Sequence, residues 1–297
     1  MLAPKPWRFD ALLRLYMGVI VCVFVGSVVA GVAEHELRAD AARTALYYAL
    51  SAAAVAAGAI TLVLALRGGE VSPRTARFGW LLAAFFLTLN LAAFAQAAGG
   101  TLPQPNSILS IVISTISFQG AALLLTWWFV REHGLGLADA FGLTAQTVPK
   151  AIALGAAVAC GAFILELGYG QLLELLRIQL PEQHLVKLIK ADRSTFDHIY
   201  LGLFAIIIAP LAEEMLFRGI LYPAIKQLGY KRLALWGTAA LFALIHMNLN
   251  TFVPLTLLAV GLALLYEKTG TLLAPVVAHS CFNGINFGLL QLGWGMC

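Results

Sequence analysis

The sequence predicts an all-α, polytopic helical membrane protein with about eight or nine transmembrane helices, and three observations support this prediction. Apolar residues make up 61% of the 297 residues and charged residues only 11%, whereas a soluble domain carries roughly 25% charged residues. The mean hydropathy is +0.86. Apolar runs long enough to cross a hydrocarbon core recur along the chain. Because only helices and closed barrels satisfy the backbone in lipid, unbroken runs of this length predict helices.

The apolar runs define the predicted spans. No internal repeat or low-complexity linker separates them, so we expect a single membrane domain over residues 1–297. The first run is too long for the apolar region of a signal peptide, which predicts that it is retained. The seventh run is short and ends in the polar letters "IHMNLN", which leaves open whether it crosses the membrane fully. The runs lie near residues 15–33, 45–66, 78–98, 108–130, 150–168, 199–220, 233–247, 251–266 and 272–292.

The distribution of Lys and Arg predicts a cytoplasmic N-terminus. With nine spans and the N-terminus inside, the inner segments carry about twice as many Lys and Arg residues as the outer segments. Residues 171–193 alternate apolar and charged positions at helical spacing and are interrupted by Pro181, which predicts a pair of amphipathic helices at the membrane interface. Packing between spans and gating of a substrate are both open as its role. The Ala- and Leu-rich composition favours a bacterial inner membrane.

Composition also excludes several classes of function. No Lys/Arg run resembles a nucleic-acid patch, so membrane lipid is an expected partner and nucleic acid is not. The four cysteines form neither a CxxC pair nor a disulfide framework, which favours small apolar side chains over redox or metal roles; they are Cys22, Cys160, Cys281 and Cys297.

Three charged residues interrupt the apolar run 199–220, in the stretch "LAEEMLFRGI". An ionisable residue at membrane depth is costly and marks a functional site by default. Glu214 and Arg218 are four positions apart, which predicts an ion pair along one helix. Glu213 is rotated by about 100° from Glu214 and lacks that partner. We therefore expect Glu213 to be the acid that is free for chemistry; the alternative is one buried salt-bridge cluster of all three residues.

Two later runs carry further polar residues at helical spacing. His279 and Asn283 are four positions apart, and Asn286 continues the same helical face. Phe242 and His246 share a face of the run before. A lone histidine in a span is usually a hydrogen-bonded packing residue, but two of them together with an acid in neighbouring runs favour a site.

The membrane depth of Glu213, His246 and His279 and the positions of two prolines indicate that these three side chains meet in one pocket. Counted from the nearest inner-side Lys or Arg at 1.5 Å per residue, Glu213, His246 and His279 lie about 20, 21 and 17 Å into the membrane. Three polar groups from three helices therefore lie at a similar level. Pro210 and Pro275 each precede one of these groups by a helical turn, and we expect each to loosen its helix beside a polar cavity.

The segments "PLAEEMLFRGILY", "LFALIHMNLN" and "LYEKTGTLLAPVVAHSCFNG" resemble, in order, the motifs EExxxR, FxxxH and HxxxN. These motifs belong to the CAAX-protease and bacteriocin-processing family (CPBP, or Abi) of intramembrane proteases, which includes the type II CAAX prenyl endopeptidases. The resemblance covers about residues 195–290, a CPBP-like catalytic core, and no motif is matched in residues 1–190. It implies an intramembrane endopeptidase in which every motif position is present: Glu213, His246, His279 and Asn283 as catalytic residues, and Glu214, Arg218 and Phe242 as supporting residues.

The residues themselves support hydrolysis by an activated water. Glu213 can take a proton from a water that His246 also holds, and His279 and Asn283 offer donors to the oxyanion of a tetrahedral intermediate. A zinc ion held by Glu213, His246 and His279 is left open, because zinc accepts two His and a carboxylate. Members of the family are often called metalloproteases, yet no cofactor is required by the sequence. We favour the version without metal, since Asn283 is a natural oxyanion donor and a poor zinc ligand.

Other chemistries find less support. The chain has no HExxH, no GxSxG and no Asp inside a predicted run, which removes the common signatures of zinc, serine and aspartyl proteases. The alternatives are a proton-coupled membrane transporter and a non-catalytic scaffold or immunity protein on the same fold. As substrate we expect a membrane-associated or lipidated peptide; prenylated C-terminal peptides are what the eukaryotic family members imply.

Overall fold

The computed structural model describes residues 4–35, 72, 73, 75, 77, 81, 88, 91, 108–190 and 194–293. The predicted span 45–66 and nearly all of 78–98 lie outside these residues. Within them the ordered elements are helices and no strand occurs. Six helices are long and apolar enough to cross a membrane, and a shorter apolar helix covers 233–244. The predicted fold class, an all-α polytopic membrane protein, is confirmed.

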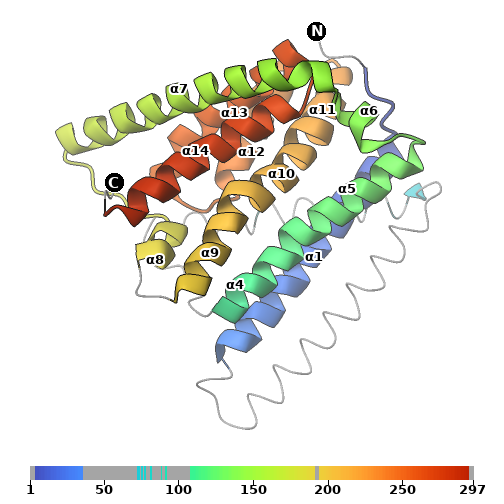
Figure 1. Cartoon of the computed structure of the whole chain (residues 1–297). Helices are drawn as coiled ribbons and strands as arrows, with labels where there is room; N and C mark the ends of the chain where they lie inside the picture. The colour runs from blue at the N-terminus through green and yellow to red at the C-terminus, as the bar shows by residue number, and fades with distance from the viewer. Residues whose placement is uncertain are drawn as a thin grey trace. The chain divides into compact units, whose positions relative to one another are not determined.

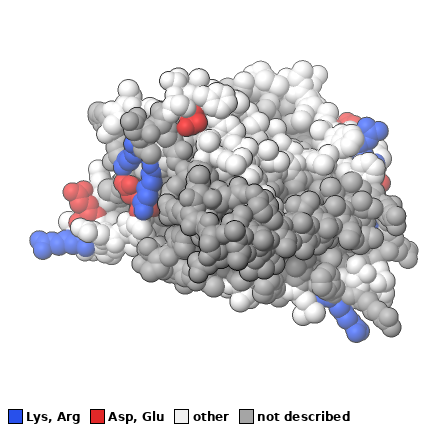
Figure 2. Space-filling model, turned by 90° about the horizontal axis from the view of Figure 1, so that it is seen from below, with Lys and Arg blue, Asp and Glu red and all other residues white. Residues whose placement is uncertain are grey.

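Charged side chains are sparse on the described surface. On the face in Figure 2, most of the described atoms belong to uncharged residues, and the Lys, Arg, Asp and Glu side chains are few. Large apolar side chains are exposed on the predicted spans, among them Leu124, Ile164 and Ile207. Such a surface is unfavourable in water and is expected of helices that face lipid.

The chain folds as two compact units. The smaller unit comprises residues 6–89 and 103–135, and the larger comprises residues 1–5, 90–102 and 136–297. In the smaller unit, three helical segments continue one another and pack along the first helix (Figure 1). Its described elements are α1 (Phe9–His35), α4 (Ile108–Thr115), the π-helical η1 (Ile116–Gly120) and α5 (Ala121–Glu132).

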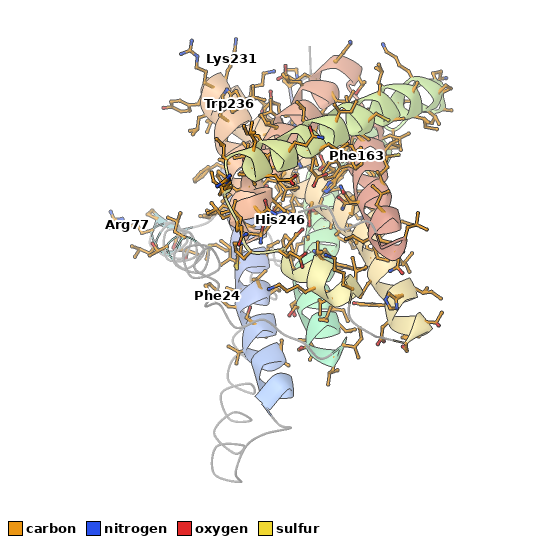
Figure 3. The ribbon with its side chains drawn as sticks, turned by 90° about the vertical axis from the view of Figure 1, so that its left-hand side faces the viewer. Phe24, Arg77, Phe163, Lys231, Trp236 and His246 are labelled. Atoms are coloured by element: carbon orange, nitrogen blue, oxygen red, sulfur yellow. The ribbon has the colours of Figure 1, made fainter. Side chains whose placement is uncertain are left out.

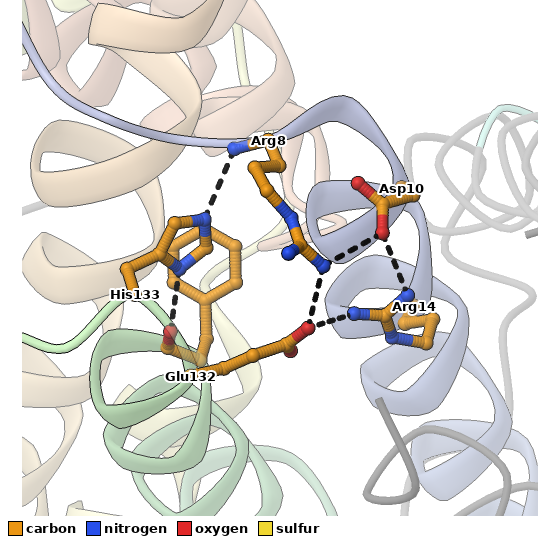
Figure 4. Close-up of polar contacts among 6 residues, drawn as sticks. Arg8, Asp10, Arg14, Glu132 and His133 are labelled. Carbon is orange, nitrogen blue, oxygen red and sulfur yellow. Dashed lines mark hydrogen bonds and ion pairs between the residues drawn. The ribbon is translucent and has the colours of Figure 1, made fainter. Parts of the chain in front are cut away.

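An ionic network ties the start of α1 to the end of α5 in the smaller unit (Figure 4). The Arg8 guanidinium lies 3.0 Å from Asp10 and 2.9 Å from Glu132. Arg14 binds the same two carboxylates. His133 accepts a hydrogen bond from the Arg8 backbone N–H at 3.0 Å. Two guanidinium groups thus share two carboxylates, so the positive and negative charges at these helix ends balance.

The larger unit contains the remaining described elements. The short segments are α6 (Leu137–Phe141), η2 (Ala145–Thr147) and α8 (His184–Lys190). The long ones are α7 (Val148–Leu175), α13 (Leu249–Thr269) and α14 (Leu273–Gln291). Two composite helices complete it. The first consists of α9 (Thr195–Leu203), η3 (Phe204–Ile208), α10 (Ala209–Glu214), η4 (Met215–Leu221) and α11 (Tyr222–Gln227). The second consists of η5 (Leu233–Gly237) and α12 (Thr238–Leu244).

The amphipathic segment 171–193 differs from its predicted form. Residues 171–175 are the end of α7 and form no separate helix, because α7 runs unbroken to Leu175. The second predicted helix corresponds to α8 (His184–Lys190). Between them, the carbonyl of Pro181 accepts a hydrogen bond from Asn248 Nδ2 at 3.0 Å. This bond fixes the connection after α7 to the loop that follows α12.

The helices α7 and α14 pack side by side in the same direction (Figure 1). They approach closely at Gly155, where a Cβ atom would lie 2.9 Å from the Ala274 carbonyl oxygen and 2.9 Å from Val277 Cγ1. No side chain fits into that space. Glycine at this position therefore sets the distance between the two helices.

We expect Gly155→Leu to destabilise the larger unit, because α7 and α14 must separate to admit the side chain. Overpacking of this kind costs about 1–3 kcal/mol. The measurement is thermal unfolding of the purified full chain in detergent. Gly161→Leu is the matched control on the same helix, since no heavy atom lies within 4 Å of its Cβ position. Equal losses for the two variants would contradict the close packing at Gly155.

Candidate active site

The composite helix from Thr195 to Gln227 carries the two acids in its α10 segment, between two π-helical segments. Single turns of π-helix inside α-helices are frequent at functional sites, because the wider turn leaves backbone groups free. The first such segment, η3, ends where Ala209 N–H donates to Phe204 O, five residues back. Glu213 and Glu214 follow within two turns.

Pro210 and the π-helix together free one carbonyl, and Asn283 occupies it. In the register of η3 the next donor would be the N–H of residue 210, directed at Ala205 O, but proline has none. Asn283 Nδ2 donates to that carbonyl at 2.8 Å. The predicted opening of the helix at Pro210 thus has a specific consequence: it docks α14 against η3. The second N–H of the Asn283 amide is left for another acceptor.

The expected effect of Pro275 is wrong. Pro275 is the third residue of α14, which begins at Leu273. The first turn of a helix has no intrahelical acceptor for its N–H groups, so proline there removes no hydrogen bond. Pro275 therefore starts the helix that carries His279 and does not loosen it.

Glu214 makes the predicted ion pair and one contact that was not predicted. Its Oε1 atom lies 2.6 Å from Arg218 Nη1 and accepts a hydrogen bond from His279 Nδ1 at 3.0 Å. The side chains of Glu214, Arg218 and His279 are 0%, 2% and 2% exposed. Because the carboxylate can only accept, Nδ1 of His279 carries the proton and Nε2 points elsewhere. Glu214 therefore joins α10 to α14.

Glu213 lies on the other side of the same imidazole. Its Oε2 atom is 4.0 Å from His279 Nε2, and the residue is 6% exposed. The neighbouring Glu214 is held by both Arg218 and His279 Nδ1, whereas Glu213 has this single, longer approach among the described residues. The two adjacent acids thus differ in the way that their spacing predicts. Both acids approach the His279 imidazole, but only Glu214 is within hydrogen-bond distance of it and of Arg218 among the described residues.

The ring of Phe242 is the common neighbour of the three motifs. It stands edge-on to His279, with centroids 5.6 Å apart, and 4.8 Å from the ring of His246. The Arg218 guanidinium lies over its face at 4.5 Å, a cation–π contact. Phe242 is completely buried. It therefore positions one residue of each motif.

His246 lies just beyond the C-terminal end of α12, in a strained turn. Figure 3 shows it well separated from Lys231 and Trp236, which lie near the start of the same segment. Its Nδ1 donates to Phe242 O at 2.7 Å, so its Nε2 is an acceptor. The next residue, Met247, has a φ of 49°. Strained non-glycine residues of this kind cluster at functional sites.

Asn286 does not point into this site as predicted. It donates to Glu166 Oε2 of α7 at 2.9 Å and to Phe282 O at 3.3 Å. Sequence reasoning overlooked Glu166, although an acid inside the predicted span 150–168 was a visible signal. The contact of Glu214 with His279 was also missed, and 65 positions of sequence separation leave no local signal for it.

The side chains that zinc prefers are present, but among the described residues they are not close enough together to bind it. His246 and His279 each donate through Nδ1 to an oxygen, which leaves Nε2 as the nitrogen a metal would take. Glu213, His246 and His279 would be the ligands. Over the described residues, however, no three His, Cys, Asp or Glu side chains are grouped so that they could hold a metal ion.

Residues 195–285 match the family model described as "Type II CAAX prenyl endopeptidase Rce1-like". All seven motif residues fall inside this segment. The matched segment runs from the start of α9 into α14 and includes the contacts that these seven residues make with one another.

One curated relative matches the chain over a stretch of similar length. The uncharacterised protein YpbD of Bacillus subtilis is 32% identical over 98 residues, which are 32% of this chain and 46% of YpbD. The chain thus spans about half the length of the curated relative that it matches. No solved structure matches the chain significantly. The α7 helix, with Glu166, precedes the segment that matches the family model.

Proposed function

We propose that the chain is an intramembrane endopeptidase that cuts a membrane-associated or lipidated peptide with a water activated by Glu213. The observation that carries this proposal is the unequal engagement of the two buried acids. Glu214 is held by Arg218 at 2.6 Å and by His279 at 3.0 Å, whereas the ion-pair distance of Glu213 in the described part of the chain is 4.0 Å, to His279 Nε2. A general base must be free to take a proton, and only Glu213 is.

His246 completes the water site in this proposal. With its proton on Nδ1, donated to Phe242 O at 2.7 Å, its Nε2 accepts one hydrogen bond. A water that donates one proton to Glu213 and the other to His246 presents its lone pair to a peptide carbonyl. Glu213 then takes the proton as the oxygen attacks, and later passes it to the leaving amine.

His279 and Asn283 serve the oxyanion. His279 donates from Nε2 when both ring nitrogens are protonated, with Nδ1 held by Glu214. Asn283 uses one N–H for Ala205 O and has the other for the oxyanion. One such donor is typically responsible for about 10²–10³ of the rate. Arg218 and Phe242 act through these groups, by holding Glu214 and spacing the two imidazoles.

The membrane setting follows from the same helices. The acids lie in the apolar span Thr195–Gln227 and His279 in the span Leu273–Gln291, so a substrate has to enter the bilayer to reach them. We propose a multi-pass protein of a bacterial inner membrane with a cytoplasmic N-terminus, in accord with the Lys/Arg distribution. Zinc, if it binds, would be held by Glu213, His246 and His279 and would polarise the carbonyl or the water; no step above requires it.

The test is cleavage of an apolar peptide library by the full chain in lipid nanodiscs, beside metal analysis. We expect wild type to cut, chelators to leave the rate unchanged, and His279→Ala to lower the rate about 10²–10³-fold without changing bound metal. His198→Ala is the control, because this histidine lies on α9 and bonds only backbone carbonyls. A stoichiometric zinc that leaves with His279→Ala, together with activity, would overturn the metal-free version.

A further inference from the structure

Glu166 is a carboxylate inside an apolar span that the proposed reaction does not use. It lies in α7, within the candidate span Leu137–Leu175. Its Oε2 accepts a hydrogen bond from Asn286 Nδ2 at 2.9 Å. Among the residues that the structure describes, no Lys, Arg or His forms an ion pair with it. An acid at this depth without a cation of its own is a functional-site candidate.

Glu166 differs from Glu214, the other acid that the proposed reaction does not use as a base. Glu214 is completely buried and its charge is matched by Arg218. Glu166 is only partly buried and has one neutral partner, an amide. For helix packing alone, a neutral glutamine would make the same bond to Asn286. The charge of Glu166 is therefore the feature that packing leaves unexplained.

The position of Glu166 relates it to the catalytic centre. Asn286 follows Asn283 by three residues and His279 by seven on the same face of α14, so it lies about 10 Å beyond His279 along the helix. Glu166 faces Asn286 because α7 runs parallel to α14, from Gly155 opposite Ala274 onward. Figure 3 marks this stretch of α7 by Phe163. An extended peptide covers about 10 Å with three residues.

We propose that Glu166, held in place by Asn286, binds a basic side chain of the substrate about three residues from the bond that is cut. Measured from the bond that is cut, this basic side chain lies toward the C-terminal end of α14. A Lys or Arg side chain supplies the cation with which Glu166 forms no ion pair among the described residues, and its long apolar stem suits a site between apolar helices. This inference rests on the proposed endopeptidase function and names the class of peptide that the same site accepts.

The test separates binding from cleavage. The probes are apolar peptides with an acetylated N-terminus, so that a Lys side chain is the only cation a peptide can carry. Each peptide has Lys, norleucine or Glu at one position, and this position is shifted by one residue from one set of peptides to the next. Their affinity is measured for the full chain with Glu213→Gln, which binds without cutting, in micelles of dodecyl maltoside. This detergent has no charged group, so it neither competes with the Lys side chain nor attracts it. We expect the best-placed Lys peptide to bind about 10- to 100-fold tighter than its norleucine counterpart.

Adding Glu166→Gln should bring that ratio to about one, and adding Glu166→Lys should make the Glu peptide the preferred one. Glu174→Gln, an exposed acid near the end of the same helix, should leave the ratio unchanged. A ratio that survives Glu166→Gln, or an equal loss of affinity for all peptides, would overturn the inference. Cleavage of the same peptides by wild type is scored separately, so a failure of the endopeptidase proposal leaves the test of Glu166 intact.

Discussion

We expect Glu213→Gln to abolish peptide cleavage and to leave the protein folded. The amide keeps the size and hydrogen bonding of the acid but cannot take a proton from water, and general-base catalysis typically contributes about 10²–10⁴ to the rate. Folding should be little affected, because the approach of Glu213 to His279 in the described part of the larger unit, at 4.0 Å, is too long for a hydrogen bond. The measurements are the initial rate on a cleaved peptide and the thermal unfolding temperature in detergent.

Glu174→Gln is the control for this prediction, since it removes an exposed carboxylate from the same unit and should change neither quantity. The neighbouring variant Glu214→Gln should lower the unfolding temperature as well as the rate, because Glu214 holds Arg218 and His279. If Glu213→Gln unfolded the protein while Glu214→Gln stayed fully active, the roles of the two acids would be reversed.

Arg218→Leu is expected to give the largest loss of stability. The substitution leaves the carboxylate of Glu214, which is 0% exposed, without its 2.6 Å guanidinium partner. Removing one member of a buried ion pair typically costs about 3–5 kcal/mol, because the remaining charge stays desolvated. The Phe242 ring also loses the cation over its face. We would measure equilibrium unfolding of the purified full chain.

Lys226→Leu provides the matched comparison, on α11 of the same composite helix. Lys226 pairs with Glu267, but these side chains are 21% and 27% exposed. A partly exposed pair contributes about 0–1 kcal/mol, since water and salt replace the lost partner. Comparable losses for Arg218→Leu and Lys226→Leu would mean that burial does not decide the strength of the first pair.

Several features were predictable because they depend on neighbours within one helix. The apolar runs predicted the seven helices that fall within the described ranges, with ends that differ by a few residues. Spacing by four positions predicted the pair of Glu214 with Arg218 and the shared face of Phe242 and His246. In both cases the period of the α-helix fixes which side chains meet.

Features that depend on how helices end were predicted less well. Pro275 was expected inside a helix but lies in the first turn of α14, because the helix starts at Leu273. Residues 171–175 were expected to form an interfacial helix but continue α7. Helix ends are set by weak local preferences that packing readily overrides, so a few residues of error change what a proline or a charge does.

The sequence by itself determined that this chain is built from membrane-crossing helices and that one of them carries a buried pair beside a second acid. Only the tertiary structure decided what these groups touch. Contacts of Glu214 with His279, Asn283 with Ala205 O and Glu166 with Asn286 join different helices. Such contacts depend on the rotation and register of whole helices, which small residues such as Gly155 and the π-helical turn before Pro210 set, and which no local spacing encodes.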